Sequence, residues 1–214
     1  MQENLVNKAV LYGVLSMALL FPSKDTVRAL GSGEIKEAIE EMIRLNILHQ
    51  GASEIAVESL SRYINQDEDV LLRQLRVEYT RLFIGAPKPA VSPYAGVWLA
   101  KKLSVEPVLF VNKEAMAVER FMAQCGVGRP ENTNEPLDHI GSELEFLQYL
   151  CLVEAGLAQP SQGTEVPEDA YGEFYTKHFQ DWAKRFALSV LKETEEPLFS
   201  VASQIVCALP EAPL

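Results

Sequence analysis

EPLDHIGSELEFLQYLC, residues 135–151, is the stretch of sequence that decides the fold. Apolar side chains recur in it three and four positions apart, which is the period of one face of an α-helix. This face consists of Leu137, Ile140, Leu144, Leu147 and Cys151. Pro136 suits the first turn of a helix, where its missing N–H would have no partner. The stretch therefore predicts a helix that begins near residue 135 and runs to about residue 158.

The start of this predicted helix carries ionisable groups that a fold does not obviously need. Glu135 and Asp138 lie where the helix dipole and the free amides favour negative charge. His139 and Glu143 lie four residues apart on another face. In a packing interpretation, Asp138 caps amides, His139 pairs with Glu143 and the face contacts another helix. In a recognition interpretation, the same groups bind a ligand.

The helical period continues along most of the chain, and we find no alternation typical of a strand. Further helices are predicted for residues 3–20, 34–48, 53–64, 67–84, 94–103, 106–125, 168–191 and 198–209. Gly85 occupies the position that commonly ends a helix. The prediction is an all-α fold, a bundle of about ten helices.

Residues 85–93 contain three prolines and are predicted to be an extended connection. We expect residues 86–97 to join two intimate lobes, about 1–85 and about 98–214. The chain has 214 residues, of which 48% are apolar, and this suffices for one domain with a sizeable core. The whole chain, 1–214, is therefore expected to form a single all-helical domain.

The formal net charge of −11 argues against binding to nucleic acids or anionic membranes. Between Arg129 and Lys177 there are ten acidic residues and no Lys or Arg, so this region is expected to attract a cationic ligand.

The three cysteines are widely spaced and include no C-x-x-C pair, which indicates a reducing cytoplasm. The apolar stretch from Leu5 to Phe21 is interrupted by polar residues such as Lys8. It is therefore predicted to be a core helix that does not enter a membrane.

The sequence contains none of the common catalytic motifs: no phosphate-binding loop, G-x-G-x-x-G, G-x-S-x-G or H-E-x-x-H. We therefore expect no enzyme activity, no cofactor and no metal. An atypical metal-dependent phosphohydrolase with ligands at Asp138 and His139 is one alternative, but such a site needs more ligands than His49 and His178 add. A small-molecule-sensing helical regulator is another, although no basic DNA-reading helix is evident.

Three blocks of the sequence carry a resemblance to a known family. Glu135-Pro136-x-Asp138-His139 resembles the E-P-x-D-H signature of the TorD/DmsD/NarJ-type twin-arginine redox-enzyme maturation chaperones. Tyr79-x-x-Leu82-Phe83-x-Gly85, followed by Pro93-Tyr94, resembles the second signature of this family. His178-x-x-x-Trp182 with Phe186 resembles its C-terminal helix. The blocks occur in the family's order over nearly the whole chain.

The resemblance implies a cytoplasmic chaperone that is all-helical and not an enzyme. Such a chaperone binds the twin-arginine signal peptide of a molybdenum or tungsten cofactor oxidoreductase subunit and delays its export until the cofactor is loaded. The expected partners are this peptide and its client subunit, and the protein is expected to be a monomer or a dimer that exchanges lobes. The expected peptide-binding residues are Tyr79, Leu82, Phe83, Pro93, Tyr94, Glu135, Asp138, His139 and Glu143. For Tyr79, Leu82 and Phe83, packing in the core is the alternative role.

Overall fold

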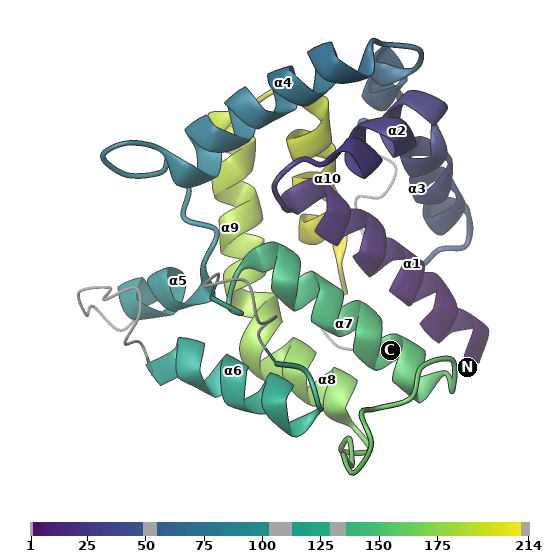
Figure 1. The fold of residues 1–214 in the computed structure, drawn as a ribbon, viewed down its shortest axis with the longest axis vertical. Coiled ribbons are helices and arrows are strands. Elements are labelled where there is room, and N and C mark those ends of the chain that lie inside the picture. The colour runs from purple at the N-terminus through teal and green to yellow at the C-terminus, as the bar shows by residue number, and fades with distance from the viewer. Residues whose placement is uncertain (1, 49–54, 103–112, 129–135, 211–214) are drawn as a thin grey trace.

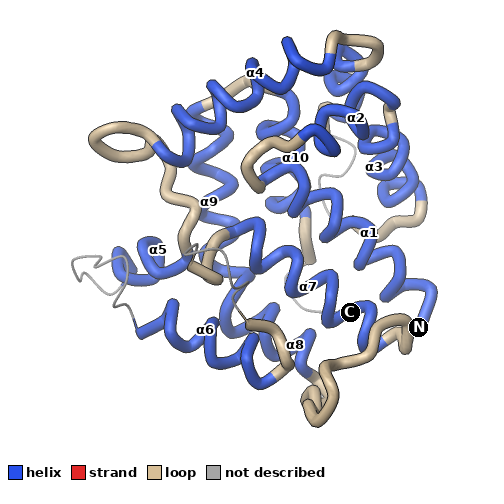
Figure 2. The backbone as a smooth tube through the Cα atoms, viewed as in Figure 1, coloured by secondary structure: helices blue, strands red, loops and turns tan. Residues whose placement is uncertain are grey.

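The computed structural model describes residues 2–48, 55–102, 113–128 and 136–210, which form helices joined by loops (Figure 2). The described elements are α1 (Gln2–Leu19), α2 (Lys24–Ser32), α3 (Glu34–Arg44), the 3-10 helix η2 (Val57–Tyr63), α4 (Glu68–Tyr79), the π-helical turn η3 (Thr80–Ile84), α5 (Ala95–Lys102), α6 (Lys113–Gln124), α7 (Ile140–Glu154), α8 (Ala170–Phe174), the π-helical turn η4 (Tyr175–Phe179), α9 (Gln180–Glu193) and α10 (Pro197–Ala208). Within these ranges there is no strand, only an isolated β-bridge between Tyr94 and His139. The prediction of an all-α bundle is confirmed.

Helix α1 runs through the middle of the molecule, with α2 and α3 on one side and α7 on the other (Figure 1). It packs along α7 more extensively than any other pair of helices packs together, and it also contacts α3 and α10. Leu5, Tyr12, Leu15 and Leu19 of α1 are buried. The apolar N-terminal stretch is thus a core helix, as predicted.

A single continuous core joins the two halves of the chain. The cluster of buried apolar side chains extends from Leu5 in α1 to Val206 in α10. Helix α10 packs against α9 and also contacts α1 and η2, so the end of the described chain packs against its beginning. This core is continuous across residues 86–97. The expected division into two lobes stays a prediction.

The turn between α1 and α2 is well specified by its sequence. Helix α1 ends at Leu19, one residue before the predicted end at residue 20. Ser23 and Thr26 then cap the start of α2 reciprocally, with each side-chain oxygen accepting the other residue's backbone N–H at 3.2 Å. No single described helix is long and apolar enough to cross a membrane, and α1 with α2 meets that test only as a pair bent by 119°.

Several predicted helices differ from the structure, among them the one expected over residues 67–84, whose last part is the π-helical turn η3. The helix expected from residue 135 begins at Ile140, because the backbone of Asp138 pairs with the segment before α5 and His139 is the N-cap of α7. The helix expected over residues 53–64 is the shorter 3-10 helix η2 in its described part. The single helix expected over residues 168–191 is divided by η4 into α8 and α9.

Candidate functional site

The signature residues meet where the loop after α4 returns to the start of α7. The N–H of Ile140 donates to the Pro93 carbonyl at 2.8 Å, and the N–H of Ala95 donates to the Asp138 carbonyl at 2.9 Å. These two bonds flank the bridge between Tyr94 and His139. The structure thus brings together Pro93, Tyr94, Asp138 and His139, which come from two distant parts of the sequence.

Asp138 caps a helix, but not the helix predicted from the sequence. Its side chain is 1% exposed, and its Oδ2 atom accepts the N–H of Gly96 at 2.9 Å. Gly96 lies in the first turn of α5, where a carboxylate satisfies a free amide and meets the positive end of the helix dipole. The carboxylate therefore connects the start of α7 to the start of α5.

His139 connects α7 to α4. Its Nδ1 atom accepts the N–H of Gly141 at 3.1 Å, and its Nε2 atom lies 3.1 Å from the hydroxyl oxygen of Tyr79. Because Nδ1 accepts a backbone proton, we assign the ring proton to Nε2, which then donates to Tyr79. The pairing of His139 with Glu143 in the packing interpretation is not observed, since Glu143 bonds elsewhere.

Glu143 is fully buried against α9. Its Oε2 atom accepts the indole N–H of Trp182 at 3.0 Å, whereas Oε1 has no hydrogen-bond partner among the described residues. Burial raises the pKa of this carboxyl well above its usual range, and the nearby charge of Asp138 raises it further. The carboxyl therefore keeps its proton to a higher pH than an exposed glutamate does.

The apolar signature residues at the end of α4 pack in the core. Tyr79, Leu82 and Phe83 are all buried. The Tyr79 and Phe83 rings are 4.9 Å apart, and Phe83 stacks on Phe186 of α9 at 5.7 Å. Tyr94 is half-buried, while Pro93 is buried. Glu135 lies outside the described residues.

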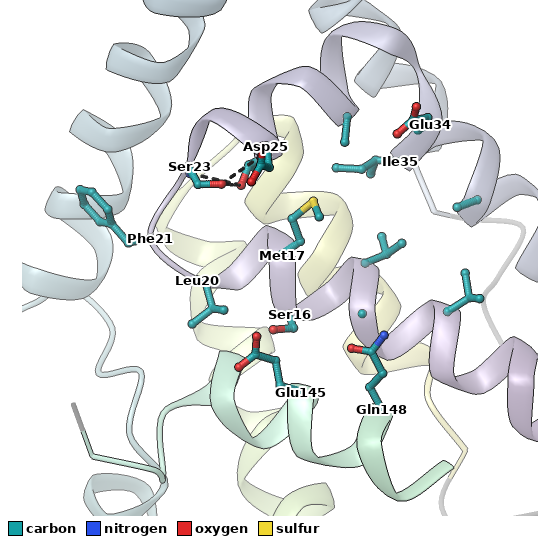
Figure 3. Close-up of a pocket in the computed structure, with 16 residues that line it drawn as sticks. Ser16, Met17, Leu20, Phe21, Ser23, Asp25, Glu34, Ile35, Glu145 and Gln148 are labelled. Atoms are coloured by element: carbon teal, nitrogen blue, oxygen red, sulfur yellow. Dashed lines mark hydrogen bonds between the residues drawn. The ribbon is translucent and has the colours of Figure 1, made fainter. Parts of the chain in front are cut away.

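An open groove borders this buried cluster. It lies between α1, α2, α3 and the start of α7, and it has a volume of about 630 Å³ (Figure 3). Phe21, 47% exposed, lies at its edge and meets the Tyr79 ring edge-on at 5.3 Å. Arg76 of α4 lies over the Phe21 ring, 5.0 Å from the ring centre. Phe21 thus belongs both to the groove and to the surroundings of Tyr79.

Two residues of this groove were missed by the sequence analysis, Phe21 and Glu145. Phe21 ends the apolar stretch that begins at Leu5, and Glu145 is one of the ten acidic residues between Arg129 and Lys177, so no local signal distinguished either residue. No group of three His, Cys, Asp or Glu side chains that could hold a metal ion is found in the described parts of the chain.

The comparisons with known proteins agree with this fold and with the resemblance to a known family. The model of the family described as nitrate reductase delta subunit matches residues 49–188. The chain therefore belongs to this family, and the resemblance to the TorD/NarJ-type proteins is confirmed.

Two curated relatives and one solved structure show how far the similarity extends. The chaperone protein TorD of Vibrio cholerae serotype O1 is 25% identical over 186 residues, 87% of this chain and 80% of the relative. That of Vibrio parahaemolyticus is 28% identical over 158 residues, 72% of this chain and 69% of the relative. A crystal structure described as a putative redox enzyme maturation protein from Archaeoglobus fulgidus superposes with a TM-score of 0.55 at 20% identity, covering 92% of this chain and 90% of the other. That likeness shows the fold.

Proposed function

We propose that this protein is a system-specific chaperone of the cytoplasm. It binds the twin-arginine signal peptide of a molybdenum or tungsten cofactor oxidoreductase subunit and assists the maturation of that subunit before export. The observation that carries the proposal is the family match over residues 49–188, which includes the signature residues from Tyr79 to Trp182. The relatives named as TorD chaperones support it.

The chemistry of the region fits a ligand that is both cationic and apolar. Residues 130–176 carry ten acidic side chains and no Lys or Arg, and the neighbouring groove is mostly apolar. An arginine side chain forms strong charge-assisted bonds with carboxylates, and an apolar segment fits such a groove.

In this proposal the buried signature residues act as positioning residues of the peptide-binding region. Asp138, His139 and Tyr79 hold α5, α7 and α4 together through hydrogen bonds of 2.9–3.1 Å. They thereby fix the half-buried Tyr94 ring and the exposed Phe21 ring, which lie nearer to solvent. One chain contains all of these residues, so we propose that the monomer is the active form.

The proposed function is tested by titrating the protein with a labelled synthetic peptide. The peptide carries two adjacent arginines followed by a Leu/Ala-rich stretch, and we expect a dissociation constant that is roughly micromolar. Replacing both arginines with lysines should weaken binding, because an ammonium lacks the two-pronged geometry of a guanidinium. Equal binding of the lysine peptide or of a scrambled peptide would contradict specific recognition.

The role of Asp138 is tested with two substitutions. Asp138→Ala should lower the free energy of unfolding by about 1 kcal/mol, since the cap on α5 is lost. Asp138→Asn retains an acceptor for Gly96 and should remain folded, yet it should bind the peptide more weakly, because a neutral acceptor holds the start of α5 less firmly than a carboxylate does. Unchanged peptide affinity in a folded Asp138→Asn protein would show that Asp138 contributes to stability alone.

A further inference from the structure

We infer that the groove between α1, α2, α3 and α7 is the docking site for one helical segment of the peptide, and that Glu145 receives an arginine of that segment. The inference rests on the proposed function and places its ligand. The groove is named the α1 groove below. It is defined by Val10, Met17 and Phe21 on its α1 side, Asp25 of α2, Ala38 of α3 and Glu145 of α7.

The shape of the α1 groove suits a helix. Val10, Val14 and Met17 line it at spacings of four and three residues, which is one face of α1, and Phe21 follows two residues after the helix ends at Leu19. From residue 10 to residue 17 this face extends about 10 Å, at 1.5 Å per residue. Two turns of an amphipathic helix have an apolar stripe of the same length and would lie along it.

The surface of the α1 groove is apolar and uncovered. Val10 is 42% exposed and Phe21 is 47% exposed, and Met17 lies between them in the sequence and also lines the groove. In the view of Figure 3 the side chain of Met17 points from α1 toward the side of the groove where Asp25 and Ile35 lie. Covering these side chains removes apolar area from water, which favours an apolar occupant.

The charge of the α1 groove selects a cation. Its lining includes Asp25, Glu34 and Glu145 but no Lys, Arg or His. Asp25 already pairs with Arg28 at 3.3 Å. Glu34 and Glu145 form no ion pair with any residue that the structure describes. A guanidinium therefore finds two unoccupied carboxylates, one on each side of the groove.

Glu145 is the better acceptor of these two carboxylates. It lies on α7, facing Leu20 and Ser16 at the end of α1 (Figure 3). These neighbours partly desolvate its carboxyl and raise its pKa, while the side chain stays exposed to an incoming ligand, so the charged form gains from an arginine. Glu34 is also exposed, but as the first residue of α3 it already meets the positive end of a helix dipole.

Residues that line the α1 groove contact the start of α7, next to the signature residue His139. The Ser16 hydroxyl donates to the Gly141 carbonyl at 3.0 Å, and the Leu20 side chain occupies the space that a side chain on Gly141 would need. Gly141 in turn donates its N–H to His139. The His139 region therefore sets the position of the groove without facing the ligand.

The test measures peptide binding by fluorescence anisotropy with the intact protein and matched variants. The probe is the synthetic peptide with two arginines and a Leu/Ala-rich stretch. Glu145→Gln should weaken binding about tenfold, as expected for a charged hydrogen bond in a partly shielded site. Glu154→Gln removes the same charge from the same helix outside the α1 groove and should change affinity less than twofold.

A second pair of variants fills the space instead of removing charge. Ala38→Trp places a ring in the α1 groove, and we expect at least a tenfold loss of affinity. Ala123→Trp places the same ring on the exposed face of α6 and serves as the control. Thermal melts show whether each variant is folded. A benzophenone amino acid at position 38 should cross-link to the peptide, and one at position 123 should not.

The outcomes separate the two proposals. If the wild-type protein binds neither the arginine peptide nor its lysine version, the proposed function is wrong. If it binds the arginine peptide but folded Glu145→Gln and Ala38→Trp bind equally well, only the α1 groove inference is wrong. Cross-linking from position 38 to a second copy of this chain, with none to the peptide, would also overturn it.

Discussion

At the scale of single residues, Glu143 has the most unfavourable position in the signature region. One of its carboxyl oxygens accepts from Trp182, the other has no described partner, and burial raises its pKa. The cost of ionisation there is a cost to the folded state alone, because the unfolded chain solvates the same group.

Glu143→Gln is therefore expected to stabilise the protein at pH 7, by on the order of 1 kcal/mol. Between the unfolded pKa of about 4.5 and the higher folded pKa, the folded protein binds more protons, so the wild-type free energy of unfolding falls as pH rises. The variant has no proton to lose at this position. Its free energy of unfolding should therefore exceed that of the wild type by an amount that grows with rising pH above 4.5 and is smallest in acid. Urea unfolding from pH 4 to pH 8 measures this.

Glu154→Gln on the same helix is the control, because it makes the same substitution at an exposed side chain. A Glu143→Gln variant that loses stability at pH 7 would show that the negative charge itself stabilises the folded region.

At the scale of elements, the end of α4 shows how local chemistry sets a boundary. The π-helical turn η3 ends at Gly85, whose φ of 42° is unfavourable for residues with a Cβ atom. A Cβ there would lie 2.4 Å from the Lys88 carbonyl oxygen and 2.7 Å from the Pro89 Cα, both backbone atoms. The loop that leads to Pro93 and Tyr94 therefore requires glycine at this point.

Gly85→Ala is expected to lower the free energy of unfolding by about 1–3 kcal/mol, from strain and the backbone clash. Gly31→Ala in α2 is the matched control, because nothing lies within 4 Å of the added Cβ and alanine favours a helix. That variant should be equal to the wild type or more stable by up to about 1 kcal/mol. Thermal unfolding followed by circular dichroism compares the two, and an equally stable Gly85→Ala would refute the requirement.

At the scale of the whole molecule, the continuous core predicts one cooperative unfolding transition. Leu5 in α1 and Val206 in α10 belong to one cluster, and α1 packs along α7 on the other side of the proline-rich segment. Helix content and the fluorescence of the two tryptophans, the half-buried Trp98 and the buried Trp182, should therefore change together in urea. Two separate transitions would instead support lobes that unfold independently.

The sequence predicts much of this architecture because most helices bury one face, and a buried face leaves a period of 3.6 residues. It does not predict where α7 begins. Asp138 and His139 have partners on α5, α7 and α4, and a partner distant in sequence decides whether a residue continues a helix or caps it. The π-helical turns η3 and η4 lie within the predicted helices 67–84 and 168–191, and the spacing of apolar residues does not reveal them.

The candidate site is predictable in composition but not in exposure. Pro93 and Tyr94 lie beside Asp138 and His139, yet Tyr79, Asp138, His139 and Glu143 are buried. The role of these residues in peptide binding stays a prediction. The α1 groove depends on the 119° bend between α1 and α2 and on the part of α7 that α1 leaves uncovered. Both depend on how helices pack against each other, which the spacing of residues within one helix does not encode.

The packing of α1 against α7 also has a consequence for the order of events during synthesis. About 120 residues separate the end of α1 from the start of α7, so at 5–20 residues per second the ribosome needs roughly 6–24 s to make the partner of α1. During that interval an apolar helix emerges without the surface that later buries it. Lys8 lies in the middle of its apolar sequence and is buried over the Tyr171 ring only in the finished fold. We expect the Lys8 ammonium, whose burial is a cost in the folded core, to keep the newly made α1 hydrated until α7 has been synthesised.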